Sequence, residues 1–415
     1  MSKTSSMVTA IFGTVLTVAA NLVIADESLP GDNCFEVTGV ASMQGVSEGF
    51  AKKMAIRDAL KSASMRQGLQ VRSQTTMNQM QITNDRARFE TSSKVENFTV
   101  LQAGIESSED IYGQPKPKPL NYEVHLLVCM GEAAKGCGTG GKSYQARLLV
   151  APLAVEDVAS VSDIRGVVQG YSLALMDELR AQGYRNLELS QSSSELIPNR
   201  AVTPNLDRNL LNNLYERSGA QYALLSVLRS ASTDNASSET WNRVKRFYNV
   251  NVEPNQRFLK LDTYLVDLLQ ARIERHFEQG VELNGEVLVG RQHPFGSAAF
   301  WQTLTGKGFR SLLETSSQDA EKSLKCKPFQ ASIAEIRGKE YFIYLNQASG
   351  IEVGDELAVY HKVDRPVNYA GKDLGSDLQP GAFLKVTRVL NDLAIAEVSE
   401  SGGIVISIGD RVTPW

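Results

Sequence analysis

The sequence predicts an α+β protein of several domains, and three observations support that class. The chain has 415 residues, which exceeds one ordinary domain. Hydrophobic residues make up 42% of it and charged residues 22%, so several cores can be buried. Strand and helix patterns occupy its first three quarters, whereas short strands and glycine turns fill the rest. We expect an α+β domain at 33–135, an α/β domain at 143–326 and a β-barrel at 327–415.

Residues 1–25 have the pattern of a secretory signal peptide. Lys3 precedes an apolar stretch that runs to about Ile24, and Val23-Ile24-Ala25 supplies the cleavage position. The alternative is an uncleaved membrane anchor, which Gly13 and several threonines within the stretch disfavour. No later run of about 20 apolar residues occurs. We therefore expect cleavage after Ala25 and export to the periplasm.

The first domain begins with alternating residues at 34–41, which predict a strand, followed by a helix at 45–67. Two long strands are expected at 95–111 and 122–130. The helix carries an alanine at every fourth position: Ala51, Ala55, Ala59 and Ala63. Such a stripe favours a helix that lies close on a sheet. Strand, helix and hairpin together indicate a compact α+β domain.

Residues 136–143 read GCGTGGKS, which fits the G-x-x-x-x-G-K-[ST] pattern of a phosphate-binding loop. That loop must leave a strand and open a helix, whose dipole then faces the phosphates. Here Tyr144–Pro152 follows and reads as a strand, and no apolar run ending in Asp offers a magnesium ligand. An exported protein also lacks an ATP supply. We interpret the stretch as a glycine-rich linker and expect no nucleotide, although nucleotide binding lost in Lys142→Ala would reverse that interpretation.

Strands and helices then alternate through the second domain, as in an α/β unit. The predicted strands are 145–153, 184–190, 221–229, 258–275 and 280–289, and the predicted helical segments are 162–182, 205–218 and 297–325. Asp163 stands near the start of the first helix, and Gly183 and Gly219 stand where the first two end.

The last region contains only short strands separated by glycine turns, which predicts a small β-barrel. These strands are expected at 331–337, 341–345, 356–360, 383–389 and 394–398. Asp373 and Asp377 lie in a glycine-rich loop, where a solvated loop is favoured over a cation site.

No motif of a hydrolase, metalloprotease or calcium loop occurs, so we expect no enzyme activity, cofactor or metal. The net charge of −4 argues against nucleic acid as a partner. The histidines are scattered and are expected to be surface or satisfied residues: His125, His276, His293 and His361. The four cysteines permit three full pairings; they are Cys34, Cys129, Cys137 and Cys326.

Read in order, several stretches resemble the flagellar assembly protein T family. Cys34-Phe-Glu-Val-Thr-Gly39 and Ala55-Ile-Arg-Asp-Ala-Leu60 resemble its N-terminal domain. Phe295-Gly-Ser-Ala-Ala-Phe-Trp-Gln-Thr303 resembles the end of its middle domain. Cys326-Lys-Pro-Phe-Gln-Ala-Ser-Ile333 and Gly350-Ile-Glu-Val-Gly-Asp-Glu-Leu357 resemble the start of its C-terminal domain. The resemblance covers nearly all of the chain after residue 25.

This resemblance implies a structural protein of the sodium-driven polar flagellum. It would form or assemble the H ring of the basal body, beside the outer L and P rings, and support T-ring and stator assembly for motility. The resemblance also implies a TolB-like middle domain, an SH3-like barrel and a ring homo-oligomer. In its light Cys137–Cys326 and Cys34–Cys129 are the expected disulfides, with Cys129–Cys137 as the rival. The alternative function is a periplasmic envelope-binding or TolB-like interaction module without a flagellar role.

Overall fold

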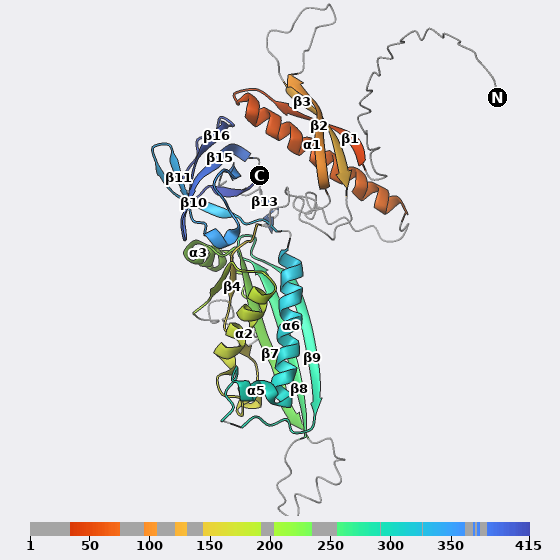
Figure 1. Cartoon of the computed structure of the whole chain (residues 1–415), viewed down its shortest axis with the longest axis vertical. Helices are drawn as coiled ribbons and strands as arrows, with labels where there is room; N and C mark the ends of the chain where they lie inside the picture. Colours follow the sequence, from red (N-terminus) through yellow and green to blue (C-terminus); the bar gives the residue numbers. More distant parts are fainter. Residues whose placement is uncertain are drawn as a thin grey trace, which may run out of the picture.

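The computed structural model describes residues 34–74, 95–105, 121–130, 144–191, 203–234, 255–290, 292–325, 327–361, 368–369, 372–373 and 380–415. Three bodies are visible in Figure 1. The N-terminal domain and the C-terminal barrel lie side by side, and the elongated middle domain extends away from both. The multi-domain α+β class predicted from the sequence is therefore observed.

The N-terminal domain is one helix on a three-stranded antiparallel sheet of order β1-β3-β2. Its elements are β1 (Cys34–Ser42), α1 (Glu48–Gln74), β2 (Val95–Ile105) and β3 (Asn121–Met130). The alanines of the predicted stripe are the face of α1 that meets the sheet, and each is 0% exposed: Ala51, Ala55, Ala59 and Ala63.

Gly39 is the position in β1 where helix and sheet come closest. A Cβ atom there would lie 2.0 Å from the carbonyl oxygen of Ala55 and 2.4 Å from the amide nitrogen of Ala59. No side chain fits at that separation, so glycine on the strand and alanine on the helix are needed together.

A disulfide bond joins Cys34 of β1 to Cys129 of β3, directly across the sheet, with their Cα atoms 4.0 Å apart. This is the pairing expected for the N-terminal domain, and it rules out the rival bond from Cys129 to Cys137. Cys137 and Cys326 both lie outside the described residues, so their pairing stays a prediction.

The middle domain is a mixed sheet of order β6-β4-β7-β8-β9, with β5 paired to β7. Its strands are β4 (Leu148–Val150), β5 (Ala154–Val155), β6 (Leu187–Leu189), β7 (Tyr222–Asp234), β8 (Gln256–Asp267) and β9 (Arg272–Asn284). Strand β4 is parallel to both of its neighbours, β6 and β7. Strand β8 is antiparallel to both of its neighbours, β7 and β9. The long β7–β8–β9 ribbon gives the domain its length (Figure 1).

Helices cover both faces of this sheet. Helices α2 (Val167–Ala181), α5 (Ala298–Gln302) and α6 (Leu304–Leu324) bury one face, and α3 (Arg208–Ser218) buries the other. Four aromatic residues pack together beneath α2: Phe295, Phe300, Trp301 and Phe309. The stretch Phe295–Thr303, which carries part of the resemblance, therefore contributes to an aromatic core. Asp207 and Gly219 cap α3 as its sequence predicts.

Several predicted boundaries in this domain were wrong: β4, β6 and α3 are shorter than expected, and two further differences have a clear physical cause. The strands expected at 258–275 and 280–289 are instead β8 and β9, which turn at 268–271. That turn contains buried Leu268 and Leu269, and Asp267 closes it by accepting hydrogen bonds from the amides of Leu269 and Gln270. A turn built from leucines gives no glycine or proline signal.

The helix expected from residue 162 begins at Val167 instead. Asp163 does not cap it. Both carboxylate oxygens of Asp163 accept hydrogen bonds at 2.8 Å from Arg257, a guanidinium side chain only 1% exposed. A buried Arg requires such a partner, and it is contributed by a strand 94 residues away.

The C-terminal domain is a closed barrel of order β10-β11-β16-β15-β12-β17. Its strands are β10 (Ala331–Arg337), β11 (Glu340–Ile343), β12 (Glu356–Tyr360), β15 (Pro380–Val389), β16 (Ala394–Ser401) and β17 (Arg411–Pro414). A separate hairpin pairs β13 (Asn368–Tyr369) with β14 (Lys372–Asp373). Sequence analysis missed β17, the strand that closes the barrel by pairing with β10 and β12.

We expect Gly39→Ala to destabilise the N-terminal domain, because the new methyl group must push α1 off the sheet. Overpacking of this kind costs about 1–3 kcal/mol or more. Gly104→Ala on β2 is the matched control, since its Cβ would meet no atom within 4 Å. Hydrogen exchange of α1 should accelerate in Gly39→Ala and not in Gly104→Ala. Equal protection of α1 in both variants would contradict the close approach.

Candidate functional site

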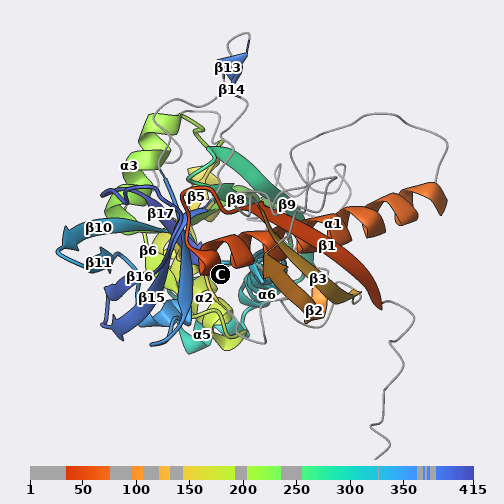
Figure 2. The same ribbon diagram turned by 90° about the horizontal axis from the view of Figure 1, so that it is seen from above.

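The first turn of α1 docks the N-terminal domain on the barrel. Phe50, 7% exposed, packs on Phe383 with ring centroids 5.4 Å apart. The Lys53 ammonium lies 2.8 Å from a Glu356 carboxylate oxygen and over the Phe383 ring. The Ser47 hydroxyl donates to Glu400 at 2.6 Å. One helix therefore serves both domains, as Figure 2 shows from above.

The contact between α1 and the barrel is close on both sides. A Cβ on Gly49 would lie 2.1 Å from a Glu400 carboxylate oxygen, and a Cβ on Gly402 would lie 2.6 Å from the Phe50 ring. The phenylalanine pair is buried between the two domains with Ala358. Apolar burial with two glycine approaches indicates a defined joint rather than a loose contact.

The middle domain meets the barrel at Arg147, just before β4. Its guanidinium donates to the carbonyl of Ser218 at 2.8 Å and to the Tyr344 hydroxyl at 3.0 Å, and it lies over the Tyr344 ring. Tyr344 also packs against Gly219, where a Cβ would lie 2.5 Å from the ring. The glycine that ends α3 therefore also makes room for the barrel.

A second middle–barrel contact lies where the chain enters the barrel. Lys327 donates to Glu274 of β9 and lies over the Tyr222 ring. The backbone amide of Gln330 donates to the Gln221 side chain at 2.8 Å. Polar contacts on both sides of the connection hold the barrel to the end of the sheet.

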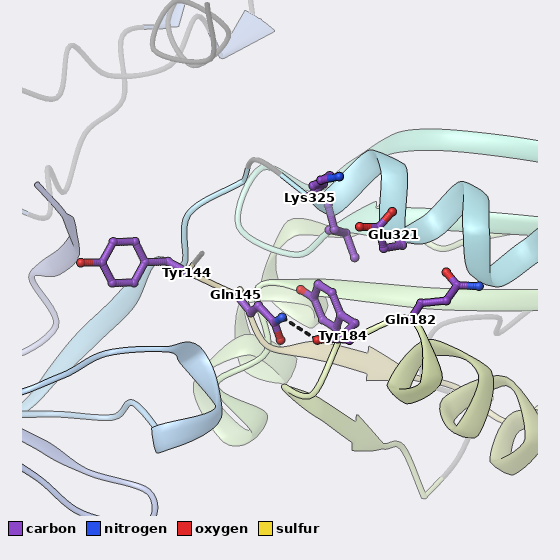
Figure 3. Close-up of a pocket in the computed structure, with 8 residues that line it drawn as sticks. Tyr144, Gln145, Gln182, Tyr184, Glu321 and Lys325 are labelled. Carbon is purple, nitrogen blue, oxygen red and sulfur yellow. Dashed lines mark hydrogen bonds between the residues drawn. The ribbon is translucent and has the colours of Figure 1, made fainter. Parts of the chain in front are cut away.

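A hollow of about 150 Å³ lies beside the same connection. Figure 3 shows its lining, with Gln145 hydrogen-bonded to the carbonyl of Gly183. Gln182 donates to Ser317, and the buried Tyr184 hydroxyl donates to the carbonyl of Ala146. Burial raises the pKa of that phenol, which keeps it neutral. The hollow is smaller than the roughly 300 Å³ of the smallest ordinary ligand pockets, and its polar groups are used internally.

GCGTGGKS itself lies outside the described residues, but the chain that follows it is described. Residues 144–147 contain no helix and lead directly into β4. A phosphate-binding loop needs a helix at this point. No helix follows Ser143, as expected, although the strand predicted at 145–153 is only the three residues of β4.

The described part of the N-terminal domain leaves an apolar strip exposed at the β2 edge of its sheet. Three apolar residues of β2 are each opposite a β3 residue that faces α1. The pairs are Phe98 with Val128, Val100 with Leu126, and Ile105 with Tyr122. Helix α1 packs chiefly against β1 and β3, so these three β2 residues stay 40–43% exposed, with Leu101 at 50%. Apolar side chains on an edge strand are typical of a surface that another chain covers.

A polar cluster lies on one face of the β7–β8–β9 ribbon. Helix α3 covers the same face at the end of the ribbon nearer the barrel. Asp262, His276 and Glu278 each place a potential ligand atom within 4.8 Å of the others. Next to them an open hollow of about 550 Å³ is lined by β8 and β9 residues. Sequence analysis singled out no such group, because the three residues come together only through the register of the two strands.

The remaining residues considered in the sequence lie apart from one another. His125 is beside Glu123 on the N-terminal sheet, and His361 lies 3.1 Å from the buried Asp410 of the barrel. Asp373 is in β14, whereas Asp377 is outside the described residues. No helix in the described part of the chain is long and apolar enough to span a membrane.

Comparisons with known proteins show limited likeness. No family model and no curated protein matches the chain. A hypothetical protein from Chlamydia trachomatis is 13% identical over 43% of this chain and 98% of its own, with a TM-score of 0.32. A PelC dodecamer from Paraburkholderia phytofirmans is 9% identical over 44% and 89%, with a TM-score of 0.26. TolB from Acinetobacter baumannii is 10% identical over 61% and 58%, with a TM-score of 0.22. Likenesses at these TM-scores identify no function.

We expect Phe50→Ala to release the N-terminal domain from the barrel, because truncating a buried phenylalanine removes about 3–5 kcal/mol of packing. Small-angle scattering should show a larger radius of gyration, with helix content unchanged. Met65→Ala on the same helix is the control, since Met65 is 50% exposed. An unchanged radius in Phe50→Ala would contradict this description of the joint.

We expect acid to weaken the joint between the middle domain and the barrel. Burial alone would raise the pKa of Glu274, but the hydrogen bond and charge of Lys327 hold it below its ordinary value of 4.5. A lowered folded pKa contributes stability above pH 4.5, which is lost as the pH falls through the folded value. The thermal midpoint of wild type should exceed that of Glu274→Gln near neutral pH, and the difference should shrink below pH 4.5. The exposed pair Glu335–Arg337 supplies the control variant Glu335→Gln, for which no such difference is expected.

Proposed function

We propose that this protein is a non-enzymatic structural protein of the periplasm. It would form or assemble the H ring of the flagellar basal body and support T-ring and stator assembly. The observation that carries the proposal is the uncovered strip on β2, because an exported domain with an apolar edge strand needs a neighbour. A ring supplies that neighbour to every copy.

The stretches that resemble the flagellar assembly protein T family support the proposal because they contain residues at tightly packed or buried places and at turns. Gly39, at the end of the first stretch, packs on Ala55 and Ala59 of the second. Phe329 of the stretch before the barrel is buried, and Gly350 and Gly354 of the last stretch adopt positive φ at the turns before β12. The architecture of the N-terminal domain and of the barrel depends on these residues, which supports the resemblance over those two domains. A TolB-like middle domain and an SH3-like barrel are part of the same proposal.

The geometry of the N-terminal sheet also favours a ring. Its two edges are different strands, β1 and β2, and only β2 carries the apolar strip. A surface that differs between the two edges suits heterologous contacts, in which one side of each copy meets the other side of the next. Such contacts close into rings, and many weak contacts then act together.

Electron microscopy of purified basal bodies tests the proposal. We expect cells without this protein to swim poorly and to lack density around the L and P rings. Phe98→Asp should reproduce that loss, because a charge on the strip opposes burial against a neighbour. Val405→Asp is the matched control, since Val405 is 82% exposed on the barrel.

Normal outer rings and normal swimming in the deletion strain would exclude the proposal. Recovery of the protein with cell-wall sacculi, together with its absence from basal bodies, would instead support the envelope-binding alternative. Loss of ring density in both Phe98→Asp and Val405→Asp would show that the strip is not the specific contact.

A further inference from the structure

The side chains of Asp262, His276 and Glu278 converge on one face of the β8–β9 pair. Asp262 on β8 is directly opposite Glu278 on β9, and Tyr264 is opposite His276. Residues opposite each other in an antiparallel pair share a face. Their potential ligand atoms all lie within 4.8 Å of one another, so small side-chain rotations bring all three to one ion.

Carboxylates outnumber the cationic side chains at this place in the described part of the chain. Like charges directly opposite each other destabilise a sheet, yet Asp262 and Glu278 are both carboxylates. Arg229 donates to Asp262 at 2.7 Å, but it also donates to Glu156 at 3.1 Å. Lys260, two residues from Asp262 on the same face of β8, lines the hollow together with Glu278. Three carboxylates against Arg229 and Lys260 leave one negative charge while His276 is neutral, which favours a bound cation.

Asp262 supplies a second, independent observation. This residue is 6% exposed, and its Oδ1 atom has no hydrogen-bond partner among the described residues. Its other oxygen, Oδ2, accepts from Arg229 and from the Tyr264 hydroxyl and lies 3.8 Å from Nε2 of His276. A buried carboxylate oxygen without a partner is unfavourable, and a bound cation would remove that cost.

Neighbouring side chains hold two of the three groups in place. The His276 ring is stacked on the Tyr264 ring, with centroids 4.3 Å apart and planes 3° apart. The Tyr264 hydroxyl in turn accepts from Arg229 at 2.8 Å. Outer contacts of this kind orient the ligands of metal sites. Glu278 has no such support and is exposed, so it completes the site from the solvent side.

We propose that Asp262, His276 and Glu278 bind one divalent transition-metal ion, with Zn²⁺ as the best match. An imidazole nitrogen with two carboxylates suits Zn²⁺, whereas Ca²⁺ and Mg²⁺ prefer oxygen ligands alone. Water takes the fourth position. The ion ties the edge strand β9 to β8 beside the open hollow, and this site does not depend on the proposed flagellar role.

Isothermal titration of Zn²⁺ into the metal-free, tag-free full chain tests the proposal. We expect one ion per chain, and binding about tenfold or more weaker in His276→Ala and in Glu278→Gln. Both positions are exposed, so the fold survives these changes. Asp262→Asn is avoided because it also alters the ion pair with Arg229. Zn²⁺ should raise the thermal midpoint of wild type more than that of either variant.

His125→Ala is the matched control, because His125 is an exposed histidine beside a single carboxylate, Glu123, at 3.4 Å. It should bind Zn²⁺ as wild type does. No Zn²⁺ binding by wild type would overturn the proposal. So would equal affinity in wild type, His276→Ala and Glu278→Gln, which would locate the ion elsewhere.

Discussion

The packing of α1 against the N-terminal sheet is the constraint on which the other arrangements depend. Glycine at position 39 and alanines on the facing helix allow the two backbones to approach until no side chain fits between them. That approach fixes how α1 lies on the sheet, and in this position Phe50 and Lys53 contact the barrel.

The same packing leaves β2 uncovered. One helix is too narrow to bury three strands, and α1 lies over β1 and β3. The Cys34–Cys129 bond joins these two strands and leaves β2 held by its hydrogen bonds to β3. The disulfide therefore joins the two strands that α1 covers. The exposed apolar strip lies on β2, the strand that α1 contacts least.

The joints between domains differ in chemistry. The contact of α1 with the barrel combines the Phe50–Phe383 pair with polar contacts of Lys53 and Ser47, whereas the middle domain reaches the barrel chiefly through Arg147 and Lys327. Hydrogen bonds from charged groups depend on protonation, while the packing of the Phe50–Phe383 pair does not. The two joints should therefore respond differently to pH and salt.

Residue patterns by themselves determined the local elements and the domain order. The alanine stripe, the caps of α3 and the short barrel strands are local signals, because propensity and capping act over a few residues. The tertiary structure alone decided the β8–β9 turn, the closing strand β17, the ion pair of Asp163 with Arg257, and the meeting of Asp262, His276 and Glu278. The turn is local, but its leucines give no turn signal. The other three depend on residues far apart in the chain or on strand register, and register follows from which faces are buried rather than from any short pattern.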